Sequence, residues 1–179
     1  MKIQLRNGII LSVALFTLAM VAPVLAANPA TITVTVTIQN LSVSASGPIA
    51  FGTVVAGSAT VSSGSSTITN DGNVTETYSL NLANPAGWTA VQAAPGAEEY
   101  ALSAQFNSTA PAGGTFSYAD HALTTAPAVC TASRFAGDQT GVSVAASATR
   151  NLWLKFEAPS TTSVTTQQTI IVTVTAAAA

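Results

Sequence analysis

The sequence predicts an all-β fold, a sandwich of two antiparallel sheets built from about seven to nine strands. Several stretches alternate apolar and polar residues, which places one face of each in a core and the other toward solvent. Turn signals rich in glycine, proline and asparagine separate these stretches. Apolar residues at helical spacing are absent after the N-terminal region, so we expect a helix only there.

The first 26 residues have the features of a secretory signal peptide. Two basic residues precede an apolar run at 9–24, and the small residues that follow allow cleavage after Ala26 or Ala27. An uncleaved membrane anchor is the alternative, and it is less favoured because Pro23 interrupts the apolar run. We therefore expect one domain at 27–179, secreted or at the cell surface, with membrane contact only before cleavage.

Ionic groups are scarce throughout the chain. Only 7% of the residues are charged, against about 25% in an ordinary soluble domain. Without the first 26 residues the chain keeps three basic and seven acidic side chains, a net charge near −4. This balance argues against nucleic acids and anionic membranes as partners, because both require clustered lysine and arginine. Cys130 is the single cysteine, either a buried small hydrophobe or an intermolecular partner.

The first predicted strand, residues 30–38, has the sequence ATITVTVTI and alternates without interruption. The isoleucine and valine side chains fall on one face and the threonines on the other. The apolar face, which is the candidate assembly strand, consists of Ile32, Val34, Val36 and Ile38. After a slip at Gln39 and Asn40 the alternation continues over 41–45, which indicates a bulge or a switch between sheets.

Residues 49–82 combine an apolar stretch, a polar strand and a tight turn. The apolar stretch ends in a glycine-bounded corner at 51–57, and the polar run closes on the β-branched residues 67–69. The turn at 70–73, with Asp71-Gly72 at its centre, is a strong hairpin signal. The strand that follows, 74–82, carries Val74, Glu76, Tyr78, Leu80 and Leu82 on one face. Because Glu76 interrupts the apolar face, we expect it at the strand's exposed start.

This order of motifs, F-G-x-V-x-x-G followed by T-N-x-G-N, resembles immunoglobulin-like β-sandwich modules of bacterial and archaeal surface and secreted proteins. It is similar in outline to the TasA/camelysin group of secreted filament-forming proteins. The resemblance covers roughly the first half of the exported chain and, more weakly, the last strand pair. It implies an immunoglobulin-like antiparallel sandwich, and it brings no catalytic residue with it.

The second half of the chain adds strands on either side of a loop-rich excursion at 107–149. Within the excursion we expect short strands near 116–118 and 142–144. The regular strands are expected at 88–93, 100–106, 150–157 and 169–175. In 150–157 the residues Leu152, Leu154 and Phe156 face the core, and Trp153 faces outward or toward a rim. Loops carry specificity, so the excursion is the candidate binding surface.

No pattern in the sequence supports a catalytic, cofactor or metal site. Residues 52–58 have phosphate-loop glycine spacing but no lysine. His121, beside Asp120, is the only histidine, and we expect a solvated loop residue. Acidic residues that could bind calcium lack its characteristic spacing: Glu98, Glu99, Asp120 and Asp138. The pattern for N-glycosylation occurs at Asn40, Asn73 and Asn107, and it has meaning only if the host modifies such sites.

The first and last predicted strands carry none of the residues that normally protect a sheet edge. No charged residue lies between Arg6 and Asp71, and none follows Glu157. Exposed edges usually carry lysine, glutamate or proline, because bare backbone groups recruit other strands. Either both strands are internal to their sheets or paired with each other, or one of them is donated to a neighbouring subunit.

These observations favour a non-enzymatic structural protein of the cell surface or extracellular matrix. Its expected partner is a second copy of itself, joined by strand pairing into a filament or surface layer. The alternative is a secreted monomeric adhesin or a glycan- or protein-binding module that uses the loops at 107–149. For that alternative the candidate binding-surface residues are Tyr118 and Trp153. An enzyme is the weakest hypothesis, and no cofactor is expected.

Overall fold

The computed structural model describes residues 29–179, and contacts divide the chain into two units, Met1–Thr37 and Ile38–Ala179. We call the second one the main unit. It consists mostly of strands with very little helix, which confirms the predicted β-rich fold. The sequence prediction placed the start of this domain at residue 27, before the 30–38 stretch, whereas the main unit begins at Ile38. Within the described residues, no helix combines the length and the apolar character needed to cross a bilayer.

The strands of the main unit vary widely in length. The described residues form β1 (Val43–Ala45), β2 (Ala59–Val61), β3 (Ser66–Asn70), β4 (Glu76–Ala83), β5 (Thr89–Ala90), β6 (Glu99–Phe106), β7 (Ala128–Val129), β8 (Thr149–Glu157) and β9 (Ile171–Ala178). One short 3₁₀-helix, η1 (Gly113–Thr115), and one α-helical turn, α1 (Tyr118–His121), lie between β6 and β7. The four longest strands, β4, β6, β8 and β9, all fall on stretches where the alternating pattern predicted a strand.

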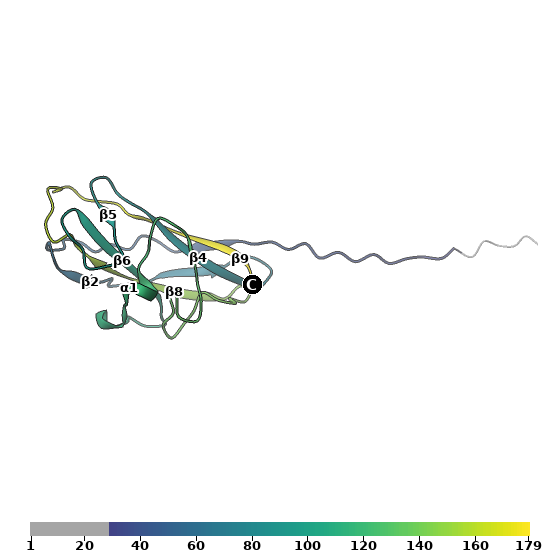
Figure 1. The fold of residues 1–179 in the computed structure, drawn as a ribbon. Helices are drawn as coiled ribbons and strands as arrows, with labels where there is room; N and C mark the ends of the chain where they lie inside the picture. Colours follow the sequence, from purple (N-terminus) through teal and green to yellow (C-terminus); the bar gives the residue numbers. More distant parts are fainter. Residues whose placement is uncertain (1–28) are drawn as a thin grey trace, which may run out of the picture. The chain divides into compact units, whose positions relative to one another are not determined.

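These strands form two sheets (Figure 1). The larger sheet has the order β1-β3-β8-β6-β5, with β2 also beside β8, and the smaller sheet has the order β7-β4-β9. Every pairing between named strands is antiparallel except that of β5 with β6. Both sheets contribute to one hydrophobic core, with Tyr78 and Leu80 from β4 and Leu102, Phe106 and Leu154 from the larger sheet.

Strand β4 shows the predicted alternation of buried and partly exposed residues. The expectation that Glu76 is exposed at its start is wrong, because this side chain is fully buried. Two neighbouring stretches of chain cover it: the backbone N–H of Ser42 donates a hydrogen bond to Glu76 Oε1 at 2.8 Å. On the other side, Val144 forms a β-bridge with Glu76. The carboxylate is thus a buried acceptor for the chain segment that leads into β1.

The excursion at 107–149 covers the outer face of β6 and β8. Trp153 is only 9% exposed, and its indole N–H donates to the backbone O of Asn107 at 2.9 Å. Gln105 donates to the backbone O of Ala136. Trp153, predicted to face outward or toward a rim, is therefore not at the surface, because the excursion packs on a face that the alternation alone assigns to solvent.

Two short strands predicted inside the excursion are absent from the structure. Residues 116–118 follow η1 and lead into α1, whose N-cap is Ser117, with a side chain that accepts a hydrogen bond from the backbone N–H of Asp120. Residues 142–144 contribute only the single bridge at Val144. Isolated short apolar runs have too little periodicity to separate a strand from a turn.

We expect alkali to destabilise the fold between about pH 10 and pH 12. Burial raises the pKa of Tyr78, Tyr100 and Tyr118 to about 12, and for Tyr118 a hydrogen bond to Glu157 adds to the effect. An unfolded tyrosine loses its proton near pH 10. In this window the folded chain binds more protons than the unfolded chain, so stability falls as the pH rises. An absorbance titration should show tyrosinate only together with the loss of circular dichroism; tyrosinate at pH 10 in folded protein would contradict this.

Candidate functional site

The stretch with the clearest strand pattern in the sequence forms no strand in the structure. Residues 30–38, which we call the N-terminal segment, have no assigned secondary structure. The side chains of its apolar face are between 78% and 89% exposed. The members of this face are Ile32, Val34, Val36 and Ile38. Among the described residues the segment has no strand partner, so the strand predicted here is not formed with any of them.

The main unit contains an open groove with a volume of about 1110 Å³, which we call the groove. Two stretches of chain line it, residues 45–56 and residues 164–172, together with side chains that belong to the core. Ile68, Leu102, Leu152, Leu154 and Phe156 are the core residues of the larger sheet that reach it. Pockets of about 300–1000 Å³ hold drug-sized ligands. The groove is thus at the upper limit for a small molecule and suits an extended segment.

Strand β9 provides an unpaired sheet edge beside the groove. It pairs with β4 along its whole length, from Ile171 opposite Ala83 to Ala178 opposite Glu76. On its other side it ends the smaller sheet, so within the described residues one row of its backbone groups has no strand partner. Val172 and Val174 pack against the core from this strand but are only partly buried, and both line the groove.

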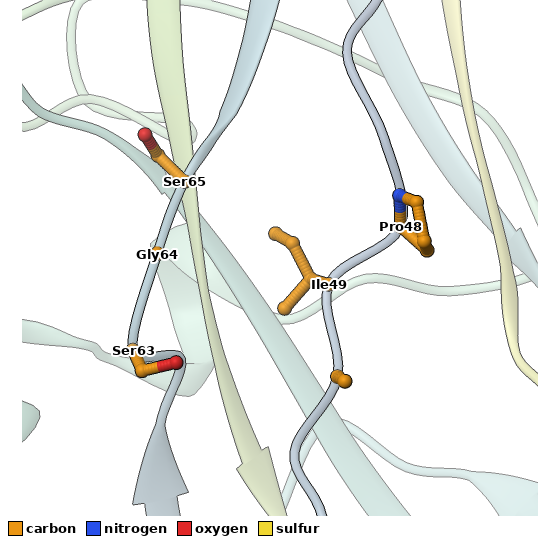
Figure 2. Close-up of a pocket in the computed structure, with 6 residues that line it drawn as sticks. Pro48, Ile49, Ser63, Gly64 and Ser65 are labelled. Atoms are coloured by element: carbon orange, nitrogen blue, oxygen red, sulfur yellow. The ribbon is translucent and has the colours of Figure 1, made fainter.

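The opposite wall of the groove, residues 47–56, contains no strand. Gly52 and Gly57 adopt positive φ angles of 66° and 70°, a conformation that favours glycine, so the chain bends at both ends of this corner. Phe51 precedes the first bend and packs against the core, with 5.6 Å between the centroids of its ring and that of Phe156. A smaller cavity of about 170 Å³ adjoins this wall, and Figure 2 shows the side chain of Ile49 between its two sides.

A hydrogen-bonded loop after β8 fixes one end of the groove. The indole N–H of Trp88 donates to Thr162 Oγ1 at 2.9 Å, and the Trp88 ring stacks on Phe156 with 6.1 Å between centroids. The carboxylate of Glu98 accepts hydrogen bonds from the backbone N–H of Ser163 and from the Thr162 hydroxyl. These bonds hold the pKa of Glu98 below its usual value. Trp88 is therefore a wall residue of the groove as well as a core residue.

The two residues predicted for a binding surface do not belong to the groove. Tyr118 is half-buried, and its hydroxyl donates to Glu157 at 2.7 Å. Trp153 is buried under the excursion, as described above. Both polar groups are thus occupied by contacts within the chain, and neither ring lies free on the surface.

Ser117, Asp120 and His121 come together at α1, in an arrangement that serves the local fold. His121 is 6% exposed, so the expectation of a solvated histidine is wrong. Its Nδ1 accepts from the backbone N–H of Ser117 at 2.9 Å, so the proton lies on Nε2 and is donated to the backbone O of Ala136 at 3.1 Å. The Ser117 hydroxyl donates to the Asp120 carboxylate. Both ring nitrogens thus have backbone partners, and the Ser117 hydroxyl lies 3.5 Å from Nδ1.

Other titratable groups do not gather into a ligand site in the part of the chain that the structure describes. Residues 29–179 contain no cluster of three or more histidine, cysteine, aspartate or glutamate side chains that could hold a metal ion. Cys130 is buried, and burial raises the pKa of its thiol to about 12. The Asp138 carboxylate accepts from the side chain and the backbone of Ser108, which lowers its pKa.

The alternation in the sequence predicts the N-terminal segment, but no local pattern predicts the groove. Its walls come from residues far apart in the chain, such as Phe51, Trp88 and Val172. The one local signal for them is the absence of charge around the first and last strands. Comparison of the chain with family models, curated proteins and solved structures gave no match.

Proposed function

We propose that this protein is a secreted, non-enzymatic structural subunit that polymerises by strand donation. The N-terminal segment of one copy occupies the groove of the next, and the repeated exchange builds a filament or a surface layer. The observation that carries the proposal is the complementarity between two parts of the described residues: an exposed segment with a strand pattern and no strand partner there, and an apolar groove beside an edge strand that has no strand on its outer side.

The dimensions of the two parts agree. Nine extended residues, 30–38, span about 30 Å at roughly 3.3 Å per residue. The neighbouring edge strand, β9, has eight residues. A donated strand on this edge adds a fourth member to the smaller sheet and satisfies backbone groups on both strands. Its side chains alternate, so the isoleucines and valines enter the groove while the threonines stay on the outer face.

Burial of the segment's apolar face contributes a large part of the free energy of the exchange. Full burial of one valine or isoleucine side chain is worth about 1.5–3 kcal/mol, so the four together contribute about 6–12 kcal/mol. Association and ordering of the segment cost an amount of similar size, about 4–15 kcal/mol. The assembly therefore depends on the new backbone hydrogen bonds as well, and a single charged side chain in the groove is enough to prevent it.

The proposed fold of the assembled subunit is an immunoglobulin-like antiparallel sandwich that the donated strand completes. Two observations support this proposed fold: the two sheets share one core, and the groove lies beside the edge strand β9. The resemblance to TasA/camelysin-type filament subunits points the same way. Export rests on the predicted signal peptide at 1–26, which lies outside the described residues.

Deletion of residues 29–37 tests the proposal, because these residues lie outside the main unit. The exported chain, residues 27–179, should form polymers visible by electron microscopy. The deletion variant should stay monomeric in sedimentation analysis while its thermal unfolding is unchanged. Polymers of the deletion variant, or an intact chain that stays monomeric at high concentration, would overturn strand donation.

A further inference from the structure

The residues that follow the N-terminal segment are held by a set of hydrogen bonds that we call the clasp. The clasp joins residues 38–42 to the turn at 70–73 and to Glu76, all within the main unit. Asn73 provides two side-chain contacts: its Nδ2 donates to the backbone O of Ile38 at 2.8 Å, and its Oδ1 accepts from the backbone N–H of Asn40 at 2.8 Å.

Three further bonds complete the clasp along the same stretch. The backbone N–H of Asn73 donates to the O of Asn40 at 3.1 Å, and that of Asp71 donates to the O of Ser42 at 2.8 Å. The N–H of Ser42 donates to Glu76 Oε1 at 2.8 Å. The bonded residues are therefore 38, 40 and 42, every second residue, which is the pattern of an extended chain paired along one edge.

The turn that carries the clasp is itself fixed. The side chain of Asn70 accepts from the N–H of Gly72 at 2.8 Å and donates to the O of Val74 at 2.8 Å and of Val144 at 2.9 Å. A Cβ atom on Gly72 would lie 2.5 Å from the backbone O of Asn40, so only glycine allows the chain to approach this closely. The turn therefore provides a fixed support for residues 38–42.

On the proposed function, each segment has two possible acceptors, the groove of its own chain and the groove of another copy. Residues 45–56 line one side of the groove. For 30–38 to lie in its own groove, between these residues and β9, the chain must reverse direction before β1, which places the reversal at 39–42. Loops of four or five residues are common in hairpins, so chain length alone does not prevent this closure.

Mass action favours closure within one chain over binding to the groove of another copy. A tethered segment reaches its own groove at an effective concentration in the millimolar range. A polymer formed from micromolar subunits cannot compete unless closure is obstructed. The reversal would have to occur in the residues that the clasp holds extended. We infer that the clasp, with Asn73 as its positioning residue, blocks self-closure and so commits the segment to a second copy of the chain.

Two substitutions release the clasp in different ways. Asn73→Ala removes both side-chain contacts. Gly72→Ala places a Cβ atom 2.5 Å from both the backbone O of Asn40 and Glu76 Oε1, so the thermal unfolding of this variant is measured beside its assembly. Asn81→Ala is the matched control, because Asn81 lies on the outer face of β4 and makes one contact, 3.5 Å long, to Thr125. Polymer yield is measured by sedimentation, and hydrogen exchange measures the protection of 30–38 in the monomer fraction.

Either clasp variant should lower the ratio of polymer to monomer by about tenfold or more, which for Asn73→Ala corresponds to the loss of two hydrogen bonds of ordinary strength. The monomers should show protected amides at 30–38, whereas monomers of the unchanged chain and of Asn81→Ala should not. Unchanged polymer yield, or monomers with an unprotected segment, would overturn the clasp inference and leave strand donation intact. If the unchanged chain is itself monomeric with a protected segment, both the inference and the proposed function fail.

Discussion

Replacement of Val34 by aspartate is expected to abolish polymer formation, whereas Thr35→Asp should leave it nearly unchanged. The two positions are neighbours in the N-terminal segment, so the variants carry the same charge in almost the same place. Val34 belongs to the face that enters the groove, and Thr35 to the face that stays outside. An unpaired carboxylate in an apolar site loses several kcal/mol of hydration. A loss of about 3 kcal/mol weakens each contact more than 100-fold.

Sedimentation velocity and electron microscopy measure the difference between these variants. Val34 is 79% exposed in the single chain, so the substitution should not change the melting temperature of the subunit. This separates an assembly defect from a folding defect. Equal polymer yields for Val34→Asp and Thr35→Asp would show that the segment does not present one face to a groove, and would refute the alternating fit.

The regular strands could be predicted because their signals are local. In β4 the period-two pattern assigns Tyr78, Leu80 and Leu82 to the core, and all three are fully buried. In β8 the same pattern assigns Leu152 and Phe156 correctly. Successive side chains of a strand point to opposite faces, so alternation in the sequence shows which face is apolar, and that face packs in the core.

The errors arise where a distant part of the chain covers a face that the local pattern leaves polar. Glu76 was predicted to be exposed, but the stretch before β1 and the loop at Val144 bury it. Trp153 was predicted to face outward or toward a rim, and the excursion at 107–149 covers it; His121, predicted to be solvated, lies within the excursion and is buried against other parts of it. Neither covering element has a periodic signal, so its position depends on tertiary contacts that no short window of sequence contains.

The same distinction between local signals and tertiary contacts applies to the candidate site. The N-terminal segment was predicted as a possible donor, because perfect alternation and missing edge protection are both visible in the sequence. The acceptor was not predicted, since a groove is the space left between elements. To predict the groove, one must know that β9 ends its sheet and that residues 47–56 form no strand. The clasp was also missed, although the turn at 70–73 was predicted, because its partners are about 30 residues away.

Mixing a donor-defective chain with an acceptor-defective chain should give dimers and nothing larger. Val34→Asp keeps the groove but cannot donate. Val172→Arg keeps the segment but places a charge on the groove side of β9, where Val172 is partly buried. Each variant alone should be monomeric. In the mixture, the intact segment of Val172→Arg enters the intact groove of Val34→Asp, and both remaining sites are defective, so growth stops after one exchange.

Native mass spectrometry distinguishes this outcome from other forms of association. Thr173→Arg is the matched control, because it adds the same charge on the exposed face of β9 and should still polymerise. Each exchange buries the same four apolar side chains, so the heterodimer should be as stable as one contact in the polymer. A mixture that stays monomeric would show that the groove beside β9 is not the acceptor. Homodimers of either variant would show a symmetric contact, which head-to-tail donation between copies does not produce.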